Sequence, residues 1–99
     1  MNKINLAVIG LGNMGNNHCK DIANIESAVL KGVWDVDQER VSLATALYQC
    51  KGYSTLDELL NEGSIDGIII ATPHYFHKDI SIEAFKRGIH VLTEKPVGV

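Results

Sequence analysis

Three glycines at the end of an apolar run have the spacing of a phosphate-binding turn. Residues 4–9 (INLAVI) are almost entirely apolar, which predicts a strand buried on both faces. Gly10, Gly12 and Gly15 follow as G-x-G-x-x-G. The first glycine allows a sharp turn, the second leaves the backbone bare for a pyrophosphate, and the third lets the next helix pack on the sheet. A helix that starts near Asn13 would point its free N–H groups and its positive dipole end at that phosphate.

A carboxylate at the end of the next apolar run completes the pattern. Asp35 lies twenty residues past Gly15 and directly follows residues 28–34 (AVLKGVW). An acid at this distance accepts hydrogen bonds from a ribose 2′-hydroxyl, so the two motifs together predict a dinucleotide-binding site. Asp35 would repel a 2′-phosphate and therefore favours NAD, whereas Arg40 is close enough in the sequence to leave NADP open. The competing interpretation is a tight strand-to-helix turn followed by a solvated Asp.

The composition fits one ordinary globular domain and argues against several other classes. The 99 residues are 45% hydrophobic and 21% charged, with a formal net charge of −3. No basic stripe is present to displace counterions from phosphates, so we expect no nucleic-acid partner. The apolar runs are far shorter than a membrane span, and the first one ends in the glycine turn rather than in a signal-peptide pattern. Cys19 and Cys50 have no C-x-x-C spacing, so we expect two reduced thiols in a cytoplasmic protein.

Strand and helix signals alternate along the chain. Strands are expected at residues 4–9, 28–34, near 53, 65–71 and 89–93, with helices between them, the first over about 13–25. Asp37 is predicted to cap the second helix, which would end at Gly52. Thr55 and Glu58 match a capping box for a short third helix that Gly63 closes.

This alternation predicts an α/β fold, a doubly wound parallel sheet that is Rossmann-like, with strand order 3-2-1-4-5 and right-handed crossovers. Ligands bind such sheets beyond the carboxyl ends of the strands at the switch point, here between the first and fourth strands. Residues 10–15, 72–77 and 94–96 follow the first, fourth and fifth strands. We therefore expect these three segments to converge on one crevice.

Helical spacing predicts which side of each helix packs on the sheet. The predicted stripe of the first helix is Met14, His18, Ile22 and Ile25, and that of the second is Val41, Ala44, Leu47 and Tyr48. His18 on such a stripe is either a packed, hydrogen-bonded histidine or a ligand. The fourth helix would pack through Phe76, Ile80 and Ala84 and stop at Gly88.

Two later segments carry a resemblance to a known family. Residues 71–77 read ATPHYFH and residues 88–96 read GIHVLTEKP. Together with the glycine motif they resemble the Gfo/Idh/MocA oxidoreductases, in which T-P-(N/H)-x-x-H and G-x-H-V-x-x-E-K-P follow G-x-G-x-x-G at these separations. The resemblance covers essentially the whole chain. It implies an NAD- or NADP-dependent enzyme that oxidises or reduces a carbon–oxygen bond, often on sugars, inositols or related small molecules.

The resemblance implies a catalytic role for a lysine near the end of the chain. Lys95 matches the family's catalytic-site lysine, whose ammonium would hydrogen-bond the reacting oxygen as hydride moves to or from the nicotinamide. A solvated loop lysine is the alternative. Glu94 would orient Lys95 or face the nicotinamide ribose, with a surface carboxylate as the rival interpretation, and the resemblance suggests a cis bond before Pro96.

The segment after the fourth strand would complete the cofactor site. The resemblance implies that Thr72 and Pro73 line the phosphate–ribose region, that His74 stands where many members have Asn, and that His77 matches the family histidine or serves at a helix start. His74 and His77 form H-x-x-H, but no further ligand completes a tetrahedral set, so no metal is predicted. The predicted cofactor contacts are Gly10, Gly12, Asn13, Met14, Gly15, Asp35, Thr72, Pro73, His74, His77, Glu94 and Lys95.

The family pattern extends beyond residue 99. Members continue with a sixth strand and a second α/β domain that supplies substrate contacts and proton-transfer groups. We therefore expect residues 1–99 to be a truncated dinucleotide-binding domain, inactive alone, that in the full-length enzyme meets a small-molecule substrate. The fifth strand would leave an apolar edge open to a second copy, which predicts a homo-oligomer.

Two rival functions are open at this point. One is a module that senses NAD(H) without catalysis, and Lys95 in its E-K-P segment argues against it. The other is an S-adenosylmethionine-dependent methyltransferase, which also uses a glycine-rich turn and an acid after the second strand. Residues 72–73 and 94–96 argue against that alternative.

Overall fold

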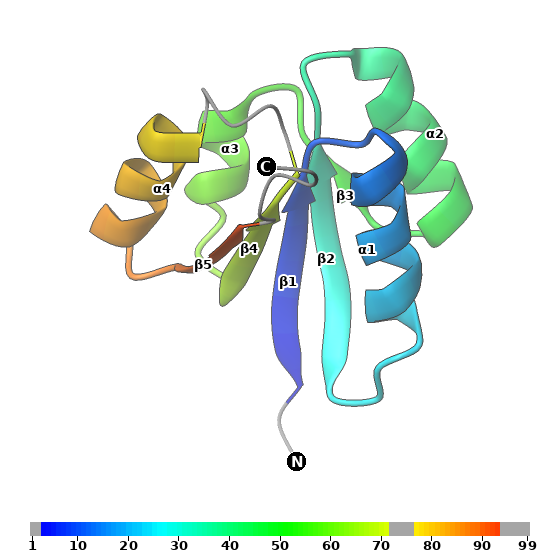
Figure 1. Ribbon diagram of the computed structural model, residues 1–99, viewed down its shortest axis with the longest axis horizontal. Coiled ribbons are helices and arrows are strands. Elements are labelled where there is room, and N and C mark those ends of the chain that lie inside the picture. The colour runs from blue at the N-terminus through cyan, green and yellow to red at the C-terminus, as the bar shows by residue number, and fades with distance from the viewer. Residues whose placement is uncertain (1–2, 72–76, 94–99) are drawn as a thin grey trace, which may run out of the picture.

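The computed structural model describes residues 3–71 and 77–93, along which strands and helices alternate (Figure 1). The strands are β1 (Ile4–Ile9), β2 (Ala28–Trp34), β3 (Lys51–Gly52), β4 (Gly67–Ile70) and β5 (His90–Thr93). The helices are α1 (Asn13–Ala23), α2 (Gln38–Tyr48), α3 (Leu56–Leu60) and α4 (His77–Lys86). Within the described ranges, every helix falls short of the length and apolar character that a membrane crossing demands.

The strands form one sheet in the order β3-β2-β1-β4-β5. Every neighbouring pair is parallel, so the carboxyl ends of the strands all point to one edge (Figure 1). The predicted Rossmann-like α/β fold and its strand order are thereby confirmed. The order reverses between β1 and β4, which is where sheets of this topology bind their ligands.

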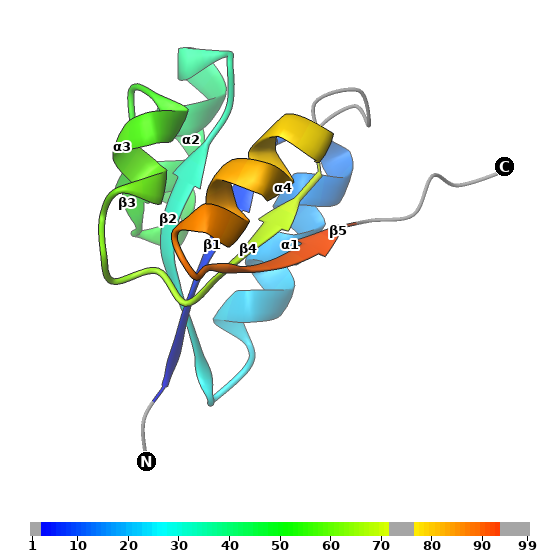
Figure 2. The same ribbon diagram turned by 90° about the vertical axis from the view of Figure 1, so that its left-hand side faces the viewer.

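Helices cover both faces of the sheet, α1 and α2 on one and α3 and α4 on the other (Figure 2). The side chains of β1 alternate between the two layers. Val8 packs in a cluster with the buried residues of α1 and α2, while Ala7 and Ile9 pack with those of α3 and α4. The nearly unbroken apolar run of β1 is therefore explained by burial on both faces, as predicted.

The helix α1 buries a face one position away from the predicted stripe. Its buried residues are Gly15, Cys19 and Ile22. Met14 is 39% exposed, and Ile25 lies past the end of the helix and is 46% exposed. The cause is Gly15. A Cβ placed on it would lie 1.8 Å from the Gly10 carbonyl oxygen directly after β1, so this face of α1 packs more closely than a side chain would allow. Of the predicted stripe, Ile22 is buried and His18 is only partly buried.

The helix α2 packs on the sheet largely as predicted. Val41 and Ala44 are buried and Tyr48 is partly buried. Leu47 was predicted on the same face but is 67% exposed. The buried positions follow i, i+3 and i+7, and this leaves Leu47 on the neighbouring, outward row.

Gly52 has a different role from the predicted helix stop. The helix α2 ends at Tyr48, and Gln49 follows in the left-handed region with φ 54°. Gly52 lies in β3, directly before Tyr53. A Cβ placed on Gly52 would lie 2.6 Å from Val41 Cγ1 in α2. The absence of a side chain therefore lets this edge strand lie against α2.

Both predicted helix caps are confirmed. The Asp37 carboxylate accepts a hydrogen bond from the Glu39 N–H at 3.0 Å, at the start of α2. At the start of α3 the Thr55 hydroxyl accepts from the Glu58 N–H, and the Glu58 carboxylate accepts from the Thr55 N–H, both at 3.2 Å. These caps fix where the two helices begin at the carboxyl edge of the sheet.

The last elements are slightly shorter than predicted. Both β4 and β5 are four residues long, and α4 packs through the buried Ile80 and Ala84. Phe76, also predicted for that face, lies outside the described residues. Gly88 follows α4 with φ 73°, the left-handed conformation expected of a helix stop.

Candidate functional site

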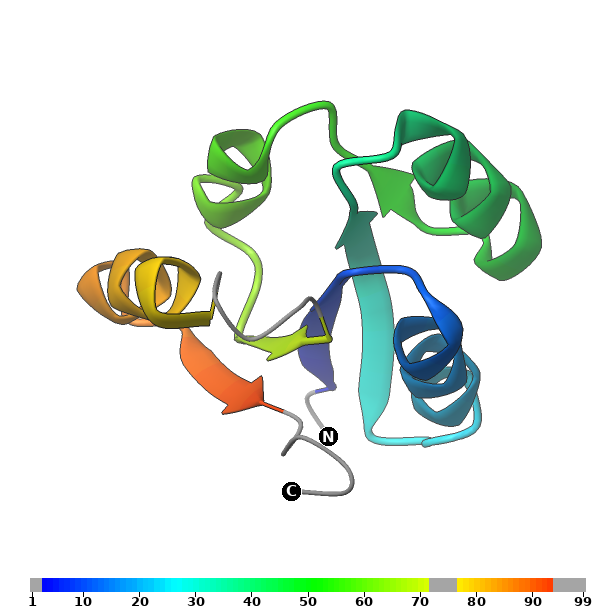
Figure 3. The same cartoon turned by 45° about the horizontal axis from the view of Figure 1, so that its top comes forward.

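The glycine-rich turn lies at the carboxyl edge of the sheet, between β1 and α1 (Figure 3). Gly10 has φ 97°, a conformation that glycine adopts readily, and its N–H donates to the Trp34 carbonyl at 2.8 Å. Gly15 permits the close contact of α1 with the turn described above. Gly12 differs from both, because the nearest atom to a Cβ placed there is Arg40 Nη1 at 3.9 Å. The backbone at Gly12 is therefore bare on an open side.

The first turn of α1 is suited to an anion. Gly12 is the N-cap residue and provides no side-chain cap, and no acidic residue occupies the first turn. Asn13 and Met14 are exposed at this end of the helix. The N–H groups that begin a helix have no partner within it and carry the positive end of the helix dipole. A phosphate over Gly12 would meet these N–H groups without a competing side chain.

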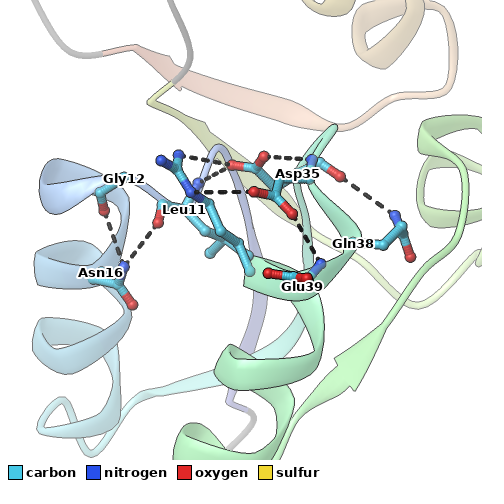
Figure 4. A network of polar contacts seen from close by, with 8 residues as sticks. Leu11, Gly12, Asn16, Asp35, Gln38 and Glu39 are labelled. Carbon is cyan, nitrogen blue, oxygen red and sulfur yellow. Dashed lines mark hydrogen bonds and ion pairs between the residues drawn. The ribbon is translucent and has the colours of Figure 1, made fainter.

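Asp35 is buried and already accepts two hydrogen bonds from the protein (Figure 4). Its Oδ2 accepts from the Leu11 N–H at 2.7 Å, and its Oδ1 accepts from the Asp37 N–H at 2.8 Å. The carboxylate thus joins the glycine-rich turn to the connection between β2 and α2. The spacing of Asp35 predicts a ribose contact and does not indicate this structural role. The D-x-D spacing of Asp35 and Asp37, which suits an Asx turn, could have indicated the second bond.

Arg40 brings a positive charge to the same place. Its Nη1 lies 3.9 Å from Asp35 Oδ2 and its Nε lies 3.9 Å from Asp37 Oδ2. The Arg40 side chain is 54% exposed, so these contacts add little to stability. The guanidinium therefore stands beside Gly12 with donors left for a ligand.

A second set of hydrogen bonds holds the turn from the side of α1. Asn16 Nδ2 donates to the Leu11 carbonyl at 2.8 Å and to the Gly12 carbonyl at 3.1 Å. The Tyr48 hydroxyl of α2 donates to Asn16 Oδ1 at 3.0 Å. Asn16 is not among the residues predicted for the site, and helical spacing predicts only a packing role for Tyr48. An Asn directly after the third glycine was the available signal, since such a side chain readily bonds nearby backbone.

The remaining predicted site residues belong to the segments that follow β4 and β5, and the structure does not describe their side chains. Ile9 pairs with Ile70, and Ile70 pairs with Thr93, so β1, β4 and β5 end side by side. The segments that follow these strands therefore start from one edge. Thr72, Pro73, His74, Glu94 and Lys95 lie outside the described residues. His77 begins α4, but its side chain is also outside the described set.

The family model for an oxidoreductase family with the NAD-binding Rossmann fold, Gfo/Idh/MocA, matches residues 4–99. The chain belongs to this family. The predicted resemblance is confirmed, and with it NAD as the cofactor of the fold. The methyltransferase alternative finds no support in this match.

Individual relatives of this Gfo/Idh/MocA chain are named as dehydrogenases. The chain is 36% identical to inositol 2-dehydrogenase of Arthrobacter sp. (strain FB24) over 95% of its length and 28% of that protein. It is 30% identical to glucose-6-phosphate 3-dehydrogenase of Bacillus subtilis (strain 168), over 95% of its length and 26% of that protein. The crystal structure of GenD2 from gentamicin A biosynthesis, in complex with NAD, superposes with a TM-score of 0.92 at 28% identity, covering 98% of this chain and 28% of the other. The chain therefore spans little more than a quarter of each of these relatives.

Proposed function

We propose that residues 1–99 form the dinucleotide-binding domain of an NAD-dependent oxidoreductase, whose substrate domain lies outside this sequence. The enzyme would transfer hydride between the nicotinamide and a hydroxyl or carbonyl carbon of a sugar, an inositol or a related small molecule. The bare, open backbone at Gly12 beside the uncapped start of α1 is the observation that carries the proposal. The inositol and sugar-phosphate dehydrogenases among the relatives support the substrate class.

The residues present fit the diphosphate of NAD. The open space at Gly12 would be filled by a side chain at any other residue type, and α1 begins without an acidic group. The N–H groups of Gly12, Asn13 and Met14 would donate to the phosphate oxygens, while Gly10 and Gly15 hold the turn and the helix in place. When bound, NAD supplies the carbon that accepts or returns the hydride.

Asp35 would recognise the adenosine ribose in addition to its two protein contacts. An ionised carboxylate has about four lone-pair sites, and two of them are used by the N–H groups of Leu11 and Asp37. The remaining sites would accept the ribose hydroxyls, and the charge would repel a 2′-phosphate. Arg40 beside Asp35 supports NADP as a second cofactor, since a guanidinium binds phosphate well.

The reaction would take place beyond β4 and β5. Lys95 would donate a hydrogen bond to the reacting oxygen and stabilise negative charge on it. Glu94 would orient Lys95, and Thr72, Pro73, His74 and His77 would line the cofactor between the diphosphate and the nicotinamide. These roles come from the sequence motifs of the family and from the shared edge at which their segments begin.

The assembly and location of the protein follow the same reasoning. A small-molecule substrate would meet the cofactor between the two domains of the full-length enzyme. The order of the sheet leaves β5 with one described neighbour, and a second copy could pair there to give a homo-oligomer. Two free cysteines support a cytoplasmic location. An NAD(H)-binding module without catalysis is the second candidate, because the described residues belong to the diphosphate and ribose side of the site.

A titration of NADH into the protein, followed by nicotinamide fluorescence, tests the proposal. We expect Gly12→Val to abolish binding, because its side chain would occupy the space over the turn. Ala46→Val is the matched control, since it adds a similar bulk at an exposed position of α2. Equal binding by wild type and Gly12→Val would refute the proposed site. In the full-length enzyme, turnover that is lost in Lys95→Ala while NADH still binds would exclude the module without catalysis.

A further inference from the structure

We propose that Asn16 and Tyr48 form a positioning pair that holds the glycine-rich turn in the shape that receives a diphosphate. This inference rests on the proposed function and extends the site to α2, whose Tyr48 is 32 residues away from Asn16 in the sequence. Neither residue is assigned contact with the reacting atoms. Both are therefore positioning residues, acting through the backbone of Leu11 and Gly12.

Leu11 is held through both of its backbone polar groups (Figure 4). Its N–H donates to Oδ2 of Asp35, the residue after β2, with an N–O distance of 2.7 Å. Its carbonyl accepts from Nδ2 of Asn16, a residue of α1, with an N–O distance of 2.8 Å. Because both groups are bound within the protein, the peptide units on either side of Leu11 are not free to rotate toward a ligand. The N–H groups left for a diphosphate begin at Gly12.

Asn16 also orients the carbonyl groups that could oppose an anion. Its Nδ2 reaches the Leu11 and Gly12 carbonyl oxygens together, and its own backbone N–H donates to the Gly12 carbonyl at 2.9 Å. These oxygens therefore face into α1, one turn past its start. A carbonyl oxygen turned instead toward the start of the helix would bring negative charge against a phosphate.

Tyr48 supports the orientation of the Asn16 amide that the Leu11 and Gly12 carbonyls require. Its hydroxyl donates to Asn16 Oδ1 at 3.0 Å, so the NH2 group is the end that remains for the carbonyls. A phenol keeps its proton at neutral pH and can donate there, and burial raises the pKa of Tyr48 further. Without this hydroxyl the Asn16 amide loses one of the bonds that hold it, so its NH2 group is less firmly fixed on the Leu11 and Gly12 carbonyls.

The test compares two tyrosine-to-phenylalanine substitutions. Tyr48→Phe removes the hydroxyl that orients Asn16 and keeps the ring. Tyr53→Phe is the matched control, because Tyr53 packs with Leu59 and Leu60 on the α3 side of the sheet, away from the glycine-rich turn. We expect Tyr48→Phe to weaken NADH binding by about fivefold, the change that corresponds to one typical hydrogen bond. Tyr53→Phe should bind NADH as the wild type does.

A double-mutant cycle separates positioning from general destabilisation. Asn16→Ala should weaken NADH binding at least as much as Tyr48→Phe, and Tyr48→Phe should add nothing in the Asn16→Ala background. In the full-length enzyme the KM for NAD should rise while kcat stays unchanged. Additive effects, an equal loss in Tyr53→Phe, or wild-type binding by Tyr48→Phe would overturn the proposal. If Tyr48→Phe does not fold, Asn16→Ala alone decides by the same binding measurement.

An NMR measurement on the cofactor-free protein keeps this inference distinct from the proposed function. The Asn16 side-chain NH2 protons should exchange slowly with solvent in the wild type and in Tyr53→Phe, and faster in Tyr48→Phe. Absence of NADH binding in the wild type would refute the proposed function and leave this measurement valid. Equal exchange in the wild type and in Tyr48→Phe would refute the positioning pair even if NADH binds.

Discussion

Replacing Asp35 should destabilise the fold as well as alter cofactor choice. The Asp35 side chain is only 7% exposed, and each of its carboxylate oxygens accepts a hydrogen bond from a backbone N–H, one from Leu11 and one from Asp37. A substitution therefore removes a connection between the glycine-rich turn and the start of α2. A side chain whose role was confined to the ribose would not affect the stability of the cofactor-free protein.

The expected magnitude follows from the number of bonds lost. A backbone N–H bonded to a charged carboxylate contributes about 1.5–3 kcal/mol. Asp35→Asn keeps one acceptor oxygen and turns an NH2 group toward the other N–H, so we expect a loss of about 2–3 kcal/mol in the free energy of unfolding. Asp35→Ala leaves the buried Leu11 N–H without a partner, and we expect a loss of about 3–4 kcal/mol.

Asp37→Asn provides the matched control for this prediction. The Asp37 carboxylate is 51% exposed and caps α2, and Asn caps helices about as well as Asp. Urea unfolding followed by circular dichroism should therefore give a free energy of unfolding within about 0.5 kcal/mol of wild type for Asp37→Asn. An Asp35→Asn protein as stable as Asp37→Asn would refute the connection through Leu11.

The same variants test the ribose role of Asp35. In a folded Asp35→Asn or Asp35→Ala protein the negative charge is lost, so the preference for NAD over NADP should relax. Calorimetric titration of both cofactors measures the ratio of their dissociation constants. An unchanged ratio would count against Asp35 as the group that selects NAD.

Further predictions concern the turn, the neighbouring cation and the core. Gly15→Ala should lower the free energy of unfolding in urea by more than about 3 kcal/mol, because its Cβ would overlap the backbone of Gly10. Gly12→Ala should be nearly as stable as wild type, since the space at Gly12 is open. Equal stabilities of the two variants would contradict this packing. Arg40→Ala should weaken NADP binding by about tenfold more than NAD binding in calorimetry, and equal weakening would remove Arg40 as a phosphate ligand. Burial raises the pKa of Cys19 from 9.0 to about 12, so the unfolded chain ionises first and stability should fall as pH rises above 9.0. Cys19→Ala should flatten that fall in urea unfolding, and an unchanged slope would contradict the burial argument.

Much of this fold could be predicted because its signals are local. The apolar runs of β1 and β2, the Thr55–Glu58 capping box and the Asp37 cap each depend on a few neighbouring residues, and each is confirmed. The alternation of strands and helices then restricts the topology to few choices. Strand order followed correctly from these elements together.

The features that could not be predicted depend on how elements meet. The rotation of α1 is decided by the contact between Gly15 and the Gly10 carbonyl, so helical spacing alone selected the wrong neighbours. The bond from Tyr48 to Asn16 joins two helices whose relative placement no local pattern contains. The internal bonds of Asp35 were missed because the same position also suits a ribose contact, and spacing does not distinguish the two.

The central claim is that the backbone at the start of α1 receives the diphosphate of NAD. The most direct test is an amide NMR titration of the isotope-labelled protein with NADH. The account predicts that the largest shifts occur at the N–H groups of Gly12, Asn13 and Met14, with the Leu11 N–H remaining protected by Asp35. Saturable binding that leaves these three N–H signals in place, or no binding at all, would contradict it.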